Sequence, residues 1–90
     1  MARKVAILVR DRQSEAFRIS AGITVLDDVI DIFVLDKKVA ADEGTQRNYG
    51  LCKELSLNMF TNNKENTELQ FLETEAIADK LLEYDIIDPY

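Results

Sequence analysis

VAILV at residues 5–9 and VIDIFVL at residues 29–35 are the two stretches that decide the fold. Each is a nearly continuous apolar run, and charged residues flank the first of them at 3–4 and 10–12. A strand with one solvated face alternates apolar and polar residues, whereas a strand buried on both faces is apolar throughout. The two runs therefore predict central strands of a sheet that is covered on both sides.

Between these runs, from residue 14 to about residue 26, the apolar residues follow a helical spacing in two adjoining stripes. The first stripe has Ala16, Ile19, Ile23 and Leu26, and the second has Phe17, Ala21 and Val25. A helix with one buried face needs only one stripe. The second stripe, beside the small residues 20–22, predicts either packing on another helix or subunit, or core packing within one chain.

Strands and helices alternate along the rest of the chain. The expected elements are a helix over about 46–57 with Thr45 as N-cap, strands at 58–61, 69–72 and 86–87, and a helix from its N-cap Thr74 to about Tyr84. A parallel crossover usually needs about a dozen residues, so the link at 62–68 is expected to be truncated or antiparallel. The pattern predicts one α/β domain over 1–90, a three-layer α/β/α fold with a mostly parallel five-stranded sheet.

Composition excludes several classes of function. The chain has 90 residues, no His, one Cys and a net charge of −6. Without His the commonest general base and metal ligand is missing, and a single Cys forms neither an internal disulfide nor a cysteine-rich metal site. Nucleic-acid binding is not expected of an acidic chain without basic clusters. Because no membrane span or signal peptide is visible, we expect a cytoplasmic protein.

Ligands of parallel sheets bind beyond the carboxyl ends of the strands, and this edge supplies the candidate site. The candidate ligand-binding residues there are Arg10, Arg12, Ser14 and Asn62, which together predict an anion or nucleotide site at the start of the first helix. The alternative is that the two arginines pair with neighbouring acids. Because no glycine-rich phosphate motif is present, no cofactor is expected.

Three carboxylates on one loop are candidate ligands for Mg²⁺ or Ca²⁺. They are Asp36, Asp42 and Glu43, and their spacing matches no EF-hand loop. A solvated loop explains them better, so no metal site is expected.

Cys52 is the only soft nucleophile in the chain. A reactive thiol needs exposure and a lowered pKa, for which Lys53 and Arg47 are the nearby cations. However, Cys52 is three residues from both Tyr49 and Leu55, which places it on the apolar side of its helix. This spacing predicts a buried core residue.

Four segments together resemble the DsrE/DsrF-like family of small sulfur-relay proteins. They are KVAILVRD at 4–11, SEAFRISAGITV at 14–25, VIDIFVLD at 29–36 and LETEAIADKLLEYD at 72–85. The resemblance implies a five-stranded α/β/α sheet, assembly into homo- or hetero-oligomers and, in some members, transfer of sulfur as a persulfide on one cysteine.

The resemblance also implies where such a cysteine belongs, just after the third strand. This sequence has Thr61, Asn62 and Asn63 there, and Cys52 lies upstream. The leading hypothesis is therefore a non-catalytic subunit linked to sulfur metabolism. The alternatives are a sulfur carrier or sulfurtransferase that uses Cys52 and a ligand-binding module at Arg10 and Arg12.

Overall fold

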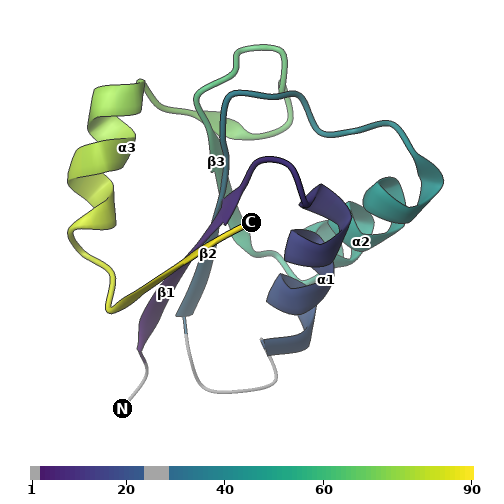
Figure 1. The fold of residues 1–90 in the computed structure, drawn as a ribbon, viewed down its shortest axis with the longest axis horizontal. Coiled ribbons are helices and arrows are strands. Elements are labelled where there is room, and N and C mark those ends of the chain that lie inside the picture. Colours follow the sequence, from purple (N-terminus) through teal and green to yellow (C-terminus); the bar gives the residue numbers. More distant parts are fainter. Residues whose placement is uncertain (1–2, 24–28) are drawn as a thin grey trace.

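The computed structural model describes residues 3–23 and 29–90, and these contain five strands and three helices (Figure 1). In chain order these are β1 (Lys4–Val9), α1 (Gln13–Ile23), β2 (Val29–Val34), α2 (Glu43–Glu54), β3 (Asn58–Thr61), β4 (Gln70–Phe71), α3 (Thr74–Leu81) and β5 (Ile86–Pro89). The strands form one sheet in the order β4-β3-β2-β1-β5, and every neighbouring pair is parallel. The predicted α/β fold is confirmed.

The short link between β3 and β4 is truncated rather than antiparallel, so the antiparallel alternative was wrong. β4 has two residues and pairs only with the end of β3, with Gln70 opposite Phe60 and Phe71 opposite Thr61. The link from the end of β3 to the start of β4 therefore runs back along the sheet by only the length of two residues. A parallel pair that short needs no helical crossover.

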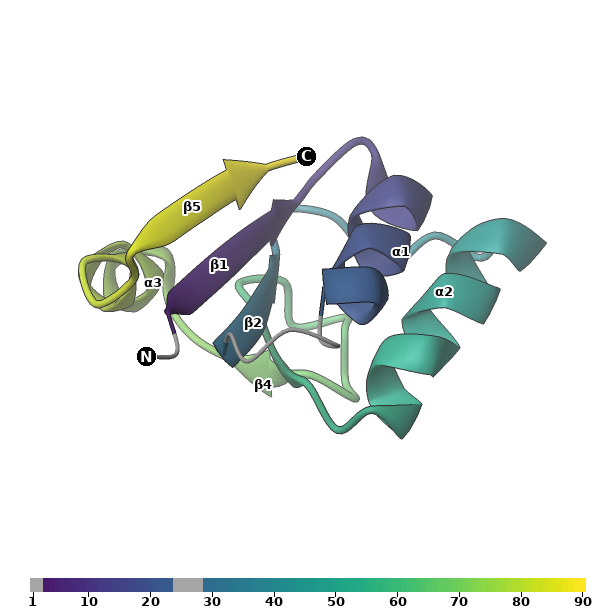
Figure 2. The ribbon, with the colours of Figure 1, turned by 90° about the horizontal axis from the view of Figure 1, so that it is seen from below.

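The helices lie on both faces of the sheet, α1 and α2 on one and α3 on the other (Figure 2). Alternate residues of β1 and β2 contribute to two cores. On the side of α1 and α2 these are Val5, Ile7, Val9, Ile30, Ile32 and Val34, and on the side of α3 they are Ala6 and Phe33, followed by Leu35. Both runs are continuously apolar because each strand has a core on either face.

Helix α2 covers the second apolar stripe of α1. The rings of Phe17 and Tyr49 have centroids 5.4 Å apart, and Cys52 Sγ lies 3.2 Å from the carbonyl oxygen of Phe17. Ser20 is fully buried on α1, and its hydroxyl donates to the carbonyl of Ala16 at 2.8 Å. In the described residues this stripe is core packing within one chain, so it no longer supports an oligomer. The predicted positions Val25 and Leu26 lie outside the described residues.

Asp31 is the one charged residue within the run of β2, and it is buried on the side of α3. Its carboxylate accepts hydrogen bonds from the Tyr84 hydroxyl and, at 3.1 Å, from Asn58 Nδ2. Burial and this carboxylate together raise the pKa of Tyr84. Because a buried carboxylate needs such donors, Asp31 fixes the segment after α3 against the sheet.

Two helix starts differ from the sequence prediction. α2 begins at Glu43, and its N-cap is Asp42 rather than Thr45, because Asp42 Oδ2 accepts the Thr45 N–H at 3.0 Å. Hydrogen bonds from the backbone and the side chain of Thr45 lower the pKa of Asp42. α3 begins at Thr74 with Glu73 at the N-cap position, and it ends at Leu81, before Tyr84. Thr74 is therefore a helical residue whose hydroxyl is available for another partner.

Helix α2 ends in a Schellman motif built on a non-glycine residue. Ser56 has a φ of 58°, its N–H donates to Lys53 O at 3.0 Å, and the Leu57 N–H donates to Cys52 O at 3.2 Å. Glycine is the usual residue at this left-handed position, because a Cβ there costs about 1 kcal/mol. The serine is therefore a strained C-terminal cap.

None of the helices in the described ranges 3–23 and 29–90 is long and apolar enough to cross a membrane.

Exchange of Ser56 for glycine is expected to stabilise the domain by about 0.5 kcal/mol, because relief of the left-handed strain outweighs the greater freedom of glycine in the unfolded chain. The opposite exchange, Gly50→Ala, is expected to stabilise by about 0.5 to 1 kcal/mol. Gly50 lies inside α2, and an added Cβ would have no atom within 4 Å. Urea unfolding of the two variants measures both effects. A less stable Ser56→Gly variant would contradict the cap assignment.

Candidate ligand pocket at the carboxyl edge of the sheet

The connections that leave the carboxyl edge of the sheet diverge to opposite faces. Those after β1 and β2 lead to α1 and α2, whereas the one after β4 leads to α3 on the other side. Such a divergence is where ligands bind in open parallel sheets. It brings the ends of β1, β2 and β3 next to the N-terminus of α3.

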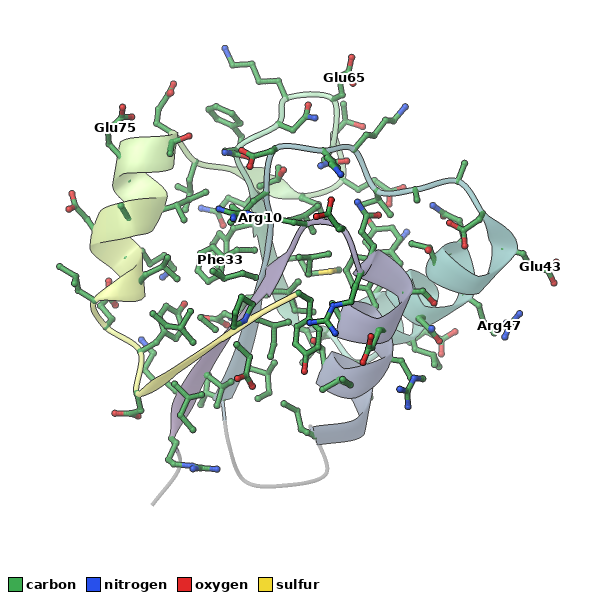
Figure 3. All side chains as sticks on the ribbon, in the orientation of Figure 1. Arg10, Phe33, Glu43, Arg47, Glu65 and Glu75 are labelled. Atoms are coloured by element: carbon green, nitrogen blue, oxygen red, sulfur yellow. The ribbon has the colours of Figure 1, made fainter. Side chains whose placement is uncertain are left out.

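A cavity of about 160 Å³ lies at this place, between α3 and the sheet. We call it the carboxyl-edge pocket. Its apolar lining consists of Leu8, Leu35, Ile77, Ala78 and Leu81, and its polar lining consists of Arg10, Asp36, Asn62 and Thr74. Figure 3 shows Arg10 near Phe33 on the α3 side, far from Glu43 and Arg47 at the outer side of α2. An apolar cavity with a few converging polar groups is the usual form of a small-molecule site.

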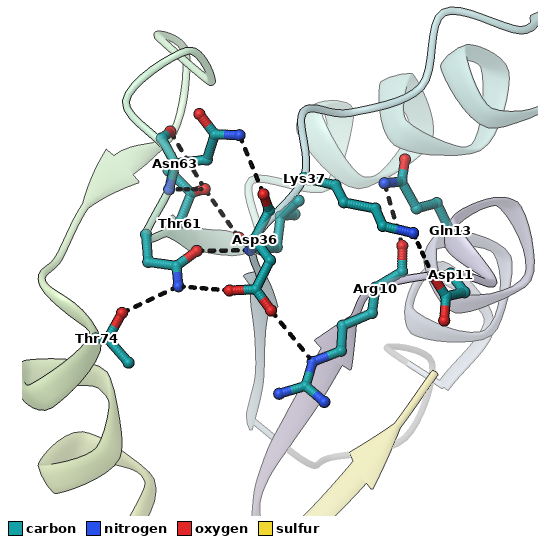
Figure 4. A network of polar contacts seen from close by, with 10 residues as sticks. Arg10, Asp11, Gln13, Asp36, Lys37, Thr61, Asn63 and Thr74 are labelled. Atoms are coloured by element: carbon teal, nitrogen blue, oxygen red, sulfur yellow. Dashed lines mark hydrogen bonds and ion pairs between the residues drawn. The ribbon is translucent and has the colours of Figure 1, made fainter.

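Asn62 connects three of the elements around this pocket. Its Oδ1 accepts the Asp36 N–H at 2.7 Å, and its Nδ2 donates to Asp36 Oδ1 at 3.1 Å and to Thr74 Oγ1 at 3.2 Å. The chain of contacts from Thr74 to Arg10 is drawn in Figure 4. The loops after β2 and β3 are thereby fixed to the first turn of α3.

The backbone of Asp36 is strained at the position where it enters the pocket. Its φ is 67°, in the left-handed region that a residue with a Cβ rarely adopts. Aspartate and asparagine tolerate this region best, and the two hydrogen bonds with Asn62 hold it there. Backbone strain of this kind collects at binding sites, because the surrounding contacts there enforce one geometry.

Arg10 and Asp36 give the pocket one positive and one negative group. Arg10 Nε lies 3.8 Å from Asp36 Oδ2, which is beyond hydrogen-bond distance, and both side chains are more than half exposed. An exposed ion pair of this length contributes little to stability. The guanidinium and the carboxylate are therefore both accessible to a ligand.

The structure brings together two of the four predicted ligand-binding residues, Arg10 and Asn62. Arg12 instead lies 3.6 Å from Glu15 and stacks 5.1 Å from the centroid of the Tyr90 ring. Ser14 accepts a hydrogen bond from Asn48 Nδ2 at 3.1 Å and faces α2. Arg12 and Ser14 therefore lie outside the lining of the carboxyl-edge pocket, because their side chains turn toward α1, α2 and the C-terminal strand.

Asp36 and Thr74 are the pocket residues that the sequence did not indicate. The sequence offers Asp36 as a metal ligand together with Asp42 and Glu43, but the structure separates these carboxylates. Asp42 caps α2, and Glu43 lies 3.9 Å from Arg47. Among the described residues no group of three metal-ligating side chains comes together. The only sequence signal for Asp36 is its place directly after a buried strand.

Cys52 is a core residue, as its helical position predicted. It is fully buried between α1 and α2, and burial raises the pKa of its thiol to about 11. A thiol that is both buried and protonated is inert at neutral pH. These features disfavour sulfur transfer through Cys52.

A second hollow of about 220 Å³ lies beside Asn66, between the loop after β2 and the link before β4. The polar groups there bind one another. Asn66 donates to Lys37 O and Thr61 Oγ1 at 3.0 Å and accepts the Val39 N–H at 2.9 Å. Glu68 accepts hydrogen bonds from Tyr49 and Lys53 nearby. These hydrogen bonds hold the β3–β4 link in place, and they leave few polar groups of the hollow for a ligand.

Comparison with protein-family models, with curated proteins and with solved structures gives no match for this chain.

The native Cys52 thiol is expected to react with an alkylating reagent only after unfolding, because it is buried. Burial raises the pKa of the thiol from 9.0 to about 11, so the folded protein binds the thiol proton more tightly than the unfolded chain does. The resulting part of the unfolding free energy is fully present below pH 9 and is lost as the pH rises to 11. Cys52→Ala should remove that part of the fall in unfolding free energy. Rapid labelling of the folded protein at neutral pH would show that the thiol is accessible and would contradict this account.

Proposed function

We propose that this chain is a non-catalytic α/β domain that binds a small molecule in the carboxyl-edge pocket. The observation that supports the proposal is the convergence of Arg10, Asp36, Asn62 and Thr74 over a cavity with an apolar lining. A ligand with an apolar body and a polar head matches these two parts. The hydrogen bonds of Asn62 hold the polar part in position before a ligand arrives, which lowers the entropy cost of binding.

The chemistry of the pocket favours binding over catalysis. The thiol lies in the other core, on the far side of the sheet, and the chain has no His. Asp36 and Arg10 lie at the solvent side of the pocket and are more than half exposed. Neither group is shielded from water, whereas catalytic sites usually exclude it.

Filling the pocket is expected to abolish ligand binding without loss of the fold. Ala78 lines the pocket on the exposed side of α3, so Ala78→Leu places a larger side chain in the cavity and keeps a good helix former. Ala76→Leu is the matched control, because Ala76 lies exposed on the same helix outside the pocket lining. The measurement is the thermal shift with a panel of short-chain carboxylic acids, amines, alcohols and amino acids.

We expect one compound of the panel to raise the melting temperature of both the wild type and Ala76→Leu. The same compound should leave the melting temperature of Ala78→Leu unchanged. The proposal fails if no member of the panel raises the melting temperature. It also fails if the two leucine variants respond equally.

We also propose that the chain is a DsrE-like subunit that lacks a sulfur-carrying cysteine. The support is the five-stranded α/β/α architecture together with the place of Asn62, which follows β3 and lies in the pocket. The resemblance puts the sulfur-carrying cysteine of other members in this loop. A chain with asparagine there would keep the pocket and lose the thiol chemistry.

This second proposal predicts association with itself or with related small subunits and no uptake of sulfur by the folded chain. Sedimentation velocity at micromolar concentration measures the first property, and intact mass after treatment with a persulfide donor measures the second. A strictly monomeric protein without a detectable partner would contradict the subunit role. A native protein that gains a sulfur atom would contradict the non-catalytic role.

A further inference from the structure

We propose that the ligand of the carboxyl-edge pocket is a zwitterion with an aliphatic side chain, that is, a free aliphatic α-amino acid. This inference rests on the proposed binding function and specifies the class of ligand. It depends on the charges of the pocket, the chemistry of its lining and its size.

The charges of the lining are one guanidinium and one carboxylate. Arg10 presents several N–H donors that match a carboxylate, and Asp36 presents an oxygen that matches an ammonium. Asn62 Nδ2 donates to Asp36 Oδ1, whereas among the described residues the contact of Oδ2 is Arg10 Nε, at 3.8 Å. A zwitterion that lies between the two side chains satisfies both charges and replaces their 3.8 Å contact with two closer ones.

Ligands with a single charge fit this pair poorly. An anion that approaches Arg10 also approaches Asp36, and a cation that approaches Asp36 also approaches Arg10. Phosphate is opposed further at the N-terminus of α3, where Glu73 and Glu75 add negative charge. The charges therefore select for a molecule that is neutral overall and carries both signs.

The apolar lining determines the side chain of the ligand. The five apolar residues around the pocket are all aliphatic, so the lining offers no ring on which a base or another aromatic group can stack. A cavity of about 160 Å³ is also smaller than the roughly 300 Å³ at the lower end of pockets for drug-sized molecules. A nucleotide does not fit these properties, whereas a short aliphatic side chain does.

The direct test compares three probes by isothermal titration of the intact chain. L-leucine carries both charges, N-acetyl-L-leucine lacks the ammonium and L-leucinamide lacks the carboxylate. Each modified probe is expected to bind at least about tenfold more weakly than leucine, because each loses one charge-assisted hydrogen bond. Glycine, which has both charges and no side chain, is expected to bind more weakly as well.

Two variants assign each charge of the ligand to one residue. Asp36→Asn keeps a residue that tolerates the left-handed backbone and its bond to Asn62, and it should abolish the preference for leucine over N-acetyl-leucine. Arg10→Gln should abolish the preference for leucine over leucinamide. The matched controls are Asp11→Asn and Arg12→Gln, which remove charges outside the pocket lining and should leave both preferences unchanged.

The possible results distinguish a failure of the zwitterion assignment from a failure of the proposed binding function. If N-acetyl-leucine or leucinamide binds as well as leucine, or if the preferences survive in Asp36→Asn and Arg10→Gln, the zwitterion assignment is overturned and the pocket remains a binding site. If leucine fails to bind while a simple acid or amine of the panel binds, the assignment is likewise overturned. If no compound binds, both proposals fail.

Discussion

β1 and β2 are buried on both faces, and each other element covers one of those faces or extends the sheet beside them. The side of Ile7 and Ile32 is covered by α1 and α2, whose own contact centres on Phe17 and Tyr49. The side of Phe33 is covered by α3 and by Tyr84, with the rings of Phe33 and Tyr84 in edge-to-face contact at 5.7 Å. Since α3 must cross from β4 to β5 over this face, its N-terminus comes to the carboxyl edge of the sheet.

This arrangement produces the pocket without any dedicated motif. The single short helix α3 covers this face, and an apolar hollow remains beside it next to Leu8 and Leu35. The strand ends that open onto the hollow bring polar side chains with them. Asn62 joins these side chains through its hydrogen bonds to Asp36 and Thr74. It also holds the backbone of Asp36 in the left-handed conformation, which an aspartate would otherwise avoid.

The fold could be predicted from the sequence because it depends on local patterns. The runs at 5–9 and 29–35 predicted two buried strands, and the spacing of Cys52 predicted its burial. The N-cap of α2 was missed because Asp42 and Thr45 are both favourable caps three residues apart, and the hydrogen bond between them decides which residue begins the helix. The side of α1 that α2 covers depends on a long-range contact that no spacing within α1 reveals.

The site could be predicted only in part. Sequence reasoning placed Arg10 and Asn62 at this edge because the carboxyl ends of parallel strands lie together there. The direction of a side chain beyond a strand, however, depends on its neighbours. Arg12 turns away because Glu15 and the Tyr90 ring attract it. Thr74 joins the pocket because α3 lies on the opposite face from α1, and the strand order that places it there was open in the sequence.

The measurement that tests the central claim most directly is a titration of the isotope-labelled protein with L-leucine, followed in amide ¹H–¹⁵N spectra. The account predicts saturable shifts concentrated at Arg10, Asp36, Asn62 and Thr74, with the amides of α2 unchanged. Spectra without shifts at saturating ligand, or shifts centred on α1 and α2, would contradict it.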